Sequence, residues 1–145
     1  HNSITGSAMS RYIRQLISQG ESQTLDFKYE INDASKIARS LAAFSNTDGG
    51  KLLIGVKDNG NIAGIHSEEE YYMMEAAAQL YCKPEVPFTF RRWDIEGKTI
   101  LEVDIPKARN RPYFAKSAEG KWLAYIRVKD QNLLANRVWP WGWAK

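Results

Sequence analysis

The sequence contains little cysteine, little histidine and no long hydrophobic run. Cys82 is the only cysteine, which excludes an intrachain disulfide and favours a reducing, cytoplasmic setting. The only histidines, His1 and His66, lie near no cysteine or histidine cluster, which argues against a zinc site. A helix that crosses a membrane needs about 20 consecutive apolar residues. No such run occurs, so we expect no membrane partner.

Two familiar motifs are also missing. The opening HNSITGSAMS lacks the charged and then apolar layout of a secretory signal. We interpret residues 1–8 as left over from expression, with the native chain starting at Met9. The P-loop spacing G-x-x-x-x-G-K-[ST] is absent, which excludes nucleotide hydrolysis of that kind.

What is present is the composition of one ordinary globular domain. Hydrophobic residues make up 43% of the chain and charged residues 26%, which argues against disordered and fibrous classes. No internal repeat or linker interrupts the 145 residues. We therefore expect a single domain over residues 9–137, followed by a Trp-rich tail over residues 138–145. The tail is typical of packing or of a dimer contact, so a homodimer is one expectation.

Positive charge is concentrated in the second half of the chain. Residues 1–82 hold 7 Lys and Arg against 10 Asp and Glu, whereas residues 83–145 hold 13 against 7. Such asymmetry indicates either a polyanionic partner or a solvated face of mixed charge.

Hydrophobic periodicity and turn signals together predict an α+β fold, with helices packed on a mixed, largely antiparallel sheet. The three expected helices begin near Tyr12, at a cap formed by Asn32 or Asp33, and at a capping box of Ser67 and Glu70. The expected strands cover residues 24–29, 52–56, 61–65, 88–94, 98–105, 113–116 and 121–129. The dipeptide Asn59-Gly60 predicts a type I′ hairpin.

Three acids form a first candidate site. Glu21 lies in a turn, Asp26 follows on a strand whose Leu25 and Phe27 take the opposite face, and Asp58 precedes the Asn59-Gly60 turn. Mg²⁺ prefers such oxygen ligands and could support phosphodiester cleavage if the acids converged. The structural interpretation is simpler, because Asp26 could equally pair with Lys28 or with a neighbouring arginine.

A basic strip forms a second candidate site. Over residues 121–129 the side chains alternate, so one face carries Lys121, Leu123, Tyr125, Arg127 and Lys129 and the other carries Trp122, Ala124, Ile126 and Val128. We predict that the cationic face points outward and the apolar face points to the core. Rows of Lys and Arg hold phosphates. The basic strip comprises Lys107, Arg109, Arg111, Lys116, Lys121, Tyr125, Arg127 and Lys129.

Several of these stretches together resemble the AlbA-like domain of the Schlafen family, which also occurs in many bacterial proteins described as transcriptional regulators. The first is Glu21-Ser22-x-x-x-Asp26-Phe27-Lys28, and the second is the helix end Ala43-Phe44-Ser45-Asn46-Thr47-Asp48-Gly49-Gly50. A strand and turn over residues 52–64 follow, and the likeness resumes at residues 111–113 and 125–128.

The resemblance implies an α+β domain that engages DNA or RNA. Some Schlafen members cleave structured RNA with three acids and a divalent metal, and by motif Glu21 and Asp26 match the first two, with Asp58 the nearest candidate for the third. Asp26 is one methylene shorter than the glutamate also found there, which weakens a metal site. Family members commonly continue the last matched strand with Gly-Ser, where this chain has Lys129-Asp130.

These observations predict a nucleic-acid-binding module, DNA-binding and regulatory, that has no turnover reaction and no cofactor of its own. The basic strip would hold phosphates, and Tyr125 would stack on a base. The alternative is a ribonuclease that depends on Mg²⁺ or Mn²⁺, with Glu21, Asp26 and Asp58 as ligands. A third interpretation is a small dimeric scaffold that docks a partner through the Trp-rich end.

Overall fold

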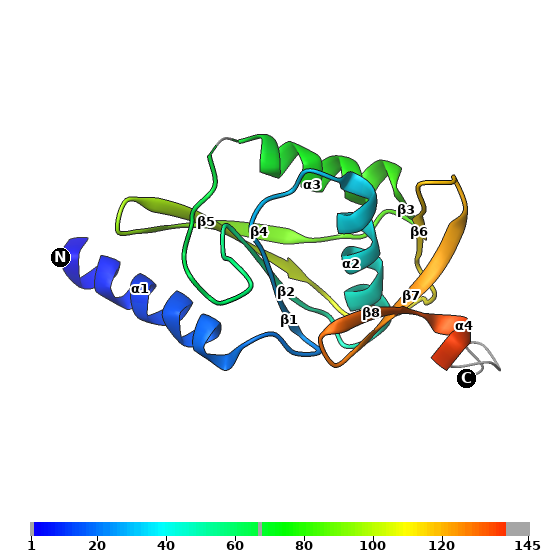
Figure 1. Ribbon diagram of the computed structural model, residues 1–145, viewed down its shortest axis with the longest axis horizontal. Coiled ribbons are helices and arrows are strands. Elements are labelled where there is room, and N and C mark those ends of the chain that lie inside the picture. Colours follow the sequence, from blue (N-terminus) through cyan, green and yellow to red (C-terminus); the bar gives the residue numbers. More distant parts are fainter. Residues whose placement is uncertain (1, 67, 139–145) are drawn as a thin grey trace.

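The computed structural model describes residues 2–66 and 68–138 of the chain (Figure 1). In chain order the elements are α1 (Asn2–Gln19), β1 (Leu25–Lys28), α2 (Ala34–Asn46), β2 (Gly50–Ile54), α3 (Glu69–Leu80), β3 (Cys82–Lys83), β4 (Thr89–Ile95), β5 (Lys98–Ile105), β6 (Phe114–Lys116), β7 (Trp122–Val128), β8 (Gln131–Leu134) and α4 (Ala135–Val138). No helix among these residues is long and apolar enough to cross a membrane.

The strands form two four-stranded sheets. The first has the order β1-β2-β5-β4, in which β1 runs parallel to β2 and the other pairs are antiparallel. The second has the order β3-β6-β7-β8 and is antiparallel throughout. The predicted α+β class is confirmed, but the expected single sheet is two sheets, with α2 packed between them (Figure 1).

Helices cover both faces of the first sheet. On one face Ile13 of α1 packs with Leu25, Phe27 and Leu53. On the other face α2 and α3 pack against the remaining apolar side chains of β2 and β5 in the main core. This explains the uninterrupted apolar run of β2, because a strand covered on both sides needs no polar face.

A buried carboxylate fastens α1 to the first sheet. Glu102 of β5 is fully buried and accepts hydrogen bonds from the Tyr12 hydroxyl (2.8 Å), the Trp93 indole N–H (2.8 Å) and the Lys51 ammonium (2.8 Å). Burial alone would raise the pKa of Glu102, but these hydrogen bonds hold it below its usual value. The network therefore stabilises a charge inside the α1 interface.

The predicted helix limits are confirmed in part. The Asp33 side chain caps α2 by accepting from the backbone N–H groups of Ser35 and Lys36, which decides between the two expected caps. The helix α3 ends at Leu80, close to the end near Tyr81 that Pro84 predicts. Ser67 lies outside the described residues, and the N-cap of α3 is Glu68, whose side chain makes no capping hydrogen bond.

The Asn59-Gly60 dipeptide does not form the predicted type I′ turn. Asn59 does not have the positive φ that such a turn requires, and the Gly60 N–H donates to the Lys57 carbonyl (2.8 Å) in a turn that places Gly60 alone in the left-handed region. The expected strand 61–65 is reduced to one bridge between Val56 and Ile62. Instead, Glu96 (φ 52°) and Gly97 (φ 79°) form the two-residue loop between β4 and β5.

The hairpin of β7 and the unpredicted β8 turns at Lys129-Asp130. Val128 pairs with Gln131, and Lys129 has a φ of 57°. This is the position at which the resembled family commonly has glycine, so the lysine keeps a left-handed backbone at a cost of about 1–2 kcal/mol. The loop geometry is therefore retained without the glycine.

Candidate nucleic-acid interface

The strand β7 has the opposite orientation to the one predicted. The Tyr125 ring packs against the main core, and the Arg39 guanidinium of α2 lies 5.6 Å from its centroid. Arg127 lies 4.7 Å above the ring of Phe44, also in α2. The face with Tyr125 and Arg127 is thus the inner face, and the face with Trp122 is the outer one. Our prediction for the two faces was wrong, because alternation separates two sets of side chains without saying which is inward.

Arg127 is a buried structural residue. Its side chain is 2% exposed and its guanidinium lies 3.5 Å from the Asp26 carboxylate. It also donates to the backbone carbonyls of Ser22 (3.1 Å) and Leu25 (3.4 Å) and to the side chain of Asn132 (2.9 Å). Because its guanidinium nitrogens all donate inside the protein, Arg127 is not placed to hold a phosphate. We therefore no longer include it in the basic strip. Tyr125 is likewise engaged and does not offer its ring to a base.

The three candidate acids are only partly brought together. Asp26 is 5% exposed, and its two carboxylate oxygens face Lys28 (3.3 Å) and Arg127 (3.5 Å). The structural interpretation, in which Asp26 pairs with Lys28 or with a neighbouring arginine, therefore agrees with both contacts. The Glu21 carboxylate accepts from the Phe27 N–H (3.0 Å) beside it, and Asp58 lies exposed in the turn over residues 57–60.

This arrangement does not fit a divalent metal held by three acids. Within residues 2–66 and 68–138, no group of three or more His, Cys, Asp and Glu side chains is placed to hold an ion. The oxygens of Asp26 already face two cations, which compete with a metal for the same lone pairs. We derive no catalytic step from these residues.

Glu21 is nevertheless an unusual carboxyl group. Burial raises its pKa to about 7, with the neighbouring Asp26 and the more distant Asp58 acting in the same direction. Between the ordinary value of 4.5 and about 7, the folded state therefore binds this proton more tightly than the unfolded state does. The stability contributed by the protonated group is present at low pH and lost as the pH rises through this window.

We expect Glu21→Gln to flatten this pH dependence. The amide keeps an acceptor for the Phe27 N–H and carries no charge, so the variant should be more stable than the wild type at pH 8 and similar to it at low pH. Urea unfolding at both pH values measures the difference. A variant that loses as much stability as the wild type between them would contradict the assigned pKa.

Four exposed cations gather at the C-terminal end of α2. The loop after β5 is held there by the Ala108 N–H, which donates to the Ser45 carbonyl (2.8 Å), and by Arg111, which donates to the Asn46 carbonyl (3.1 Å). Cations are stabilised at this end of a helix because its last carbonyls carry partial negative charge. We call this group the loop cluster; it comprises Lys107, Arg109, Arg111 and Lys129.

Lys129 is linked to Lys107, another member of the loop cluster, by a short series of contacts. Its backbone N–H donates to Gln23 (3.4 Å), whose amide donates to Asp48 (2.7 Å), and Lys107 lies 4.0 Å from the same carboxylate. Asp48 is thus the acid between the cations, and half of its side chain is exposed. A phosphate that approaches here would meet a surface with more positive than negative charge.

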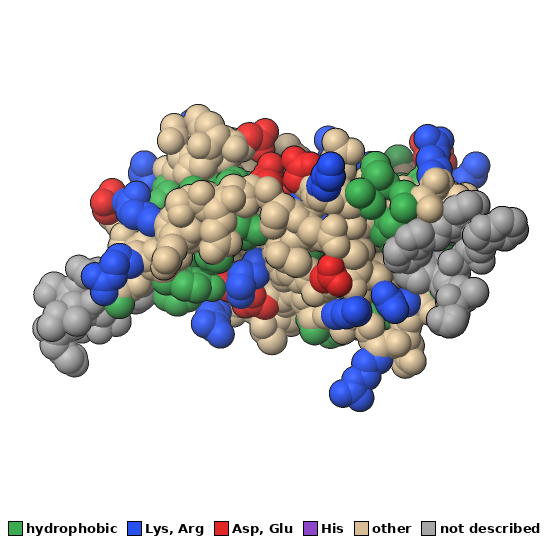
Figure 2. Space-filling view, turned by 90° about the horizontal axis from the view of Figure 1, so that it is seen from below, with side chains coloured by type: hydrophobic (Ala, Val, Ile, Leu, Met, Phe, Trp, Pro, Cys, Tyr) green, Lys and Arg blue, Asp and Glu red, His purple; other side chains and the backbone are tan. Residues whose placement is uncertain are grey.

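The remaining residues of the basic strip lie elsewhere. Lys116 ends β6 and Lys121 precedes β7, whereas Lys129 follows β7. At 3.3 Å per residue, the length of β7 separates Lys121 from Lys129 by about 26 Å. Figure 2, which views the molecule from below, shows blue side chains spread along the surface with red ones between them. The predicted continuous strip is therefore divided into separate groups.

The outer face of the second sheet carries residues that the sequence reasoning missed. Trp122 lies directly opposite Lys116 in the β6–β7 register, and the Lys83 ammonium of β3 is 5.7 Å from the Trp122 ring centroid. We call these three residues the sheet-face cluster. Trp122 had been assigned to the core. Its position directly after a charged turn that ends in Lys121 was the available signal that it faces solvent.

The comparison with known families decides the classification. The model of the family described as "Schlafen, AlbA_2" matches residues 21–136. The chain belongs to this family. The match includes β1 to β8 and therefore both sheets, the three acids and the two cation clusters.

Solved structures that are similar to this AlbA_2 domain include two from bacteria. The domain described as the "N-terminal Domain of Putative ATP-dependent DNA Helicase RecG-related Protein" from Nitrosomonas europaea is 18% identical, with a TM-score of 0.58; the alignment covers 79% of this chain and 86% of that one. The DIP2311 protein from Corynebacterium diphtheriae is 22% identical, with a TM-score of 0.57 over 82% of this chain. The chain spans only 23% of the DIP2311 chain. At these identities the likeness concerns the fold.

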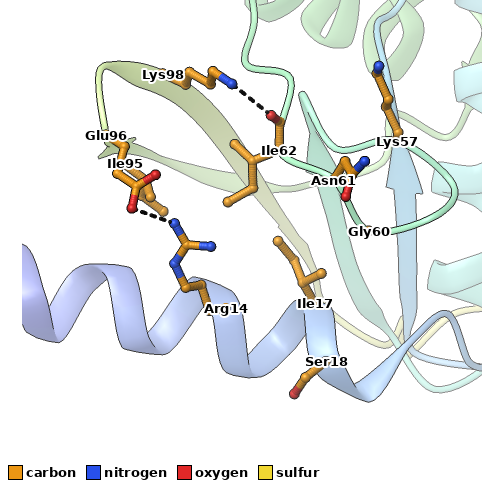
Figure 3. A pocket seen from close by; sticks show the side chains of 10 residues that line it. All are labelled: Arg14, Ile17, Ser18, Lys57, Gly60, Asn61, Ile62, Ile95, Glu96 and Lys98. Atoms are coloured by element: carbon orange, nitrogen blue, oxygen red, sulfur yellow. Dashed lines mark hydrogen bonds and ion pairs between the residues drawn. The ribbon is translucent and has the colours of Figure 1, made fainter.

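A cavity at the other end of the AlbA_2 domain is not part of either cation cluster. It has a volume of about 560 Å³ and lies between α1, the turn after β2 and the β4–β5 hairpin (Figure 3). Of its charged side chains, Arg14 pairs with Glu96 (2.9 Å) and Lys98 donates to the Ile62 carbonyl (3.3 Å), and Lys57 also lines it. The apolar part consists of Ile17, Ile62 and Ile95.

Proposed function

We propose that this AlbA_2 domain is a nucleic-acid-binding module, with DNA as its first ligand and a regulatory role, and with no turnover reaction of its own. The observation that carries the proposal is the loop cluster, in which four exposed cations lie near the end of α2 and one of them, Lys107, is 4.0 Å from the Asp48 carboxylate. Membership of the AlbA_2 family supports it. The name of the Nitrosomonas relative refers to a DNA helicase, which supports testing DNA first.

The physical basis is the exchange of counterions. Each phosphate neutralised by Lys or Arg releases about 0.9 counterions from B-DNA, so binding weakens as salt increases. The loop cluster offers up to four such contacts. Four contacts correspond to an affinity loss of about 100-fold between roughly 50 mM and 200 mM salt.

Charge reversal at Arg109 is the sharpest test. Arg109 is exposed, and Arg109→Glu should weaken binding for all sequences and lower the salt slope by about 1. Fluorescence anisotropy with a labelled duplex at several salt concentrations measures both quantities. The matched control is Arg11→Glu, which makes the same change on the exposed side of α1. Equal loss of binding in the two variants would show that only net charge matters, and would contradict a site at the loop cluster.

The metal-dependent ribonuclease remains the alternative prediction, and the geometry supports it less. Its ligands would be Glu21, Asp26 and Asp58, of which Asp26 is engaged by two cations. Adding Mn²⁺ to a labelled structured RNA in the same assay distinguishes the two functions. The binding module leaves the RNA intact, whereas the ribonuclease cleaves it. The predicted regulatory role and homodimer are likewise left to experiment.

A further inference from the structure

The outer face of the second sheet combines an exposed aromatic ring with lysines that have no acid partner. Trp122 is 38% exposed at the start of β7. Lys83 and Lys116 lie on its face and Lys121 precedes it in the chain; none of the three forms an ion pair with an acid among the described residues. Towards the other end of β7 the same face is closed, since Ile126 is 1% exposed. The accessible part is therefore confined to the edge formed by β3, β6 and the start of β7.

The register of the sheet explains why these groups meet. Lys116 pairs with Trp122, and Lys83 pairs with Phe114 on the adjoining strand, so all four side chains lie on one face. The inner face is occupied by α2, as the contact between the Cys82 thiol and the Ala38 carbonyl also shows. Phe114 is half-buried beneath this group. The result is an exposed aromatic ring on a strand, with the Lys83 ammonium over the ring and Lys116 on the paired strand.

Single-stranded nucleic acid is the polymer that matches this chemistry. Its bases are unpaired, so each presents a π-face that stacks on an aromatic side chain, while nearby lysines hold the phosphates. In a duplex the faces of the bases are already stacked on one another and cannot reach Trp122. Lysines without an acid partner add electrostatic attraction that is independent of sequence.

We propose that the sheet-face cluster, with Lys121, binds single-stranded nucleic acid by stacking a base on Trp122. This inference rests on the proposed function. It adds that the sheet-face cluster binds single-stranded rather than double-stranded nucleic acid. The loop cluster about 26 Å away along β7 contacts phosphates of either form, whereas Trp122 contacts only an unpaired base. The domain therefore prefers a substrate that has a single-stranded segment beside its other phosphate contacts.

The experiment compares Trp122→Leu with Trp122→Phe in the full chain. A labelled pyrimidine single strand and a duplex of the same length are titrated and followed by anisotropy. Trp122→Leu should weaken single-strand binding about 10- to 100-fold, in line with the loss of one stacked base, and should change duplex binding less than about twofold. Trp122→Phe keeps an aromatic face and should recover most of the affinity. Tyr72→Ala, which removes another exposed aromatic residue on α3, should change neither.

A second measurement does not depend on how well the leucine variant folds. The single strand should quench tryptophan fluorescence in the wild type, and Trp122→Phe should lose that quenching while it still binds. Wild-type protein that binds neither strand form would overturn the proposed function itself. Binding that Arg109→Glu weakens but Trp122→Leu leaves unchanged, or unchanged quenching in Trp122→Phe, would overturn the stacking inference alone.

Discussion

Replacing Arg127 with methionine is expected to lower the free energy of unfolding by about 3–5 kcal/mol. The substitution preserves much of the apolar stem but removes the charge that faces Asp26, which is 5% exposed. Lys28 stays beside that carboxylate, and the backbone carbonyls of Ser22 and Leu25 lose the guanidinium but keep a backbone N–H as donor. The reason for the large cost is the buried Asp26 carboxylate, which loses its buried cation.

Two control variants separate this effect from a general loss of charge. Lys129→Met removes an exposed cation two residues after Arg127. It should change the free energy of unfolding by less than about 0.5 kcal/mol. Asp26→Leu combined with Arg127→Met should lose less than the sum of the two single variants, because the charges are in contact. Urea unfolding gives all four values. An Arg127→Met protein as stable as the wild type, with weaker nucleic-acid binding, would restore the phosphate role that we removed.

The second large effect is expected from Asn46→Ala, at about 2–4 kcal/mol of lost stability. Asn46 is fully buried at the end of α2, where its amide group donates to the carbonyls of Tyr113 (2.9 Å) and Tyr125 (2.8 Å). Its side-chain oxygen accepts from the Tyr113 N–H (2.7 Å). Alanine removes the three hydrogen bonds that tie the backbone of Tyr113 and Tyr125 to the end of α2.

The matched control is Asn110→Ala, which changes an exposed asparagine in the loop that α2 holds. It should be within about 0.5 kcal/mol of the wild type. Because the Asn46 side chain also holds Tyr113, two residues after Arg111 of the loop cluster, the Asn46→Ala protein that remains folded should bind DNA more weakly. Thermal unfolding of both variants measures the first effect. A melting temperature unchanged by Asn46→Ala would mean that the link between α2 and the second sheet is not important for stability.

Local signals predicted α1, α2 and α3 and the β4–β5 and β6–β7 hairpins, but not α4 or the β7–β8 hairpin. Asp33 caps α2 because its carboxylate is short enough to reach the next turn, and this depends on sequence neighbours alone. The hairpins of β4–β5 and β6–β7 lie where turn residues separate two strand patterns. The prediction from Asn59-Gly60 was wrong because the conformation of the surrounding backbone overrides the preference of a dipeptide. Here that backbone places only Gly60 in the left-handed region.

The inner and outer faces of β7 could not be predicted locally. Arg127 is buried because its partners come from β1 and the turn before it; Ser22, one of them, is 105 residues away in the sequence. A lysine or arginine in an alternating strand is normally on the outer face, and only knowledge of the buried Asp26 reverses this. The candidate acids show the same limit. The spacing of Glu21 and Asp26 indicated that they meet, but not that two cations meet Asp26 first.

The most direct test of the account is a titration of the wild-type chain against single-stranded and duplex oligonucleotides at about 50 mM and about 200 mM salt. We predict binding at the lower concentration, weakening by about 100-fold at the higher one as the phosphate contacts are lost, with the single strand bound more tightly at both. Absence of binding to every oligonucleotide at about 50 mM salt would contradict the central claim that the exposed lysines and arginines of this domain form a nucleic-acid interface.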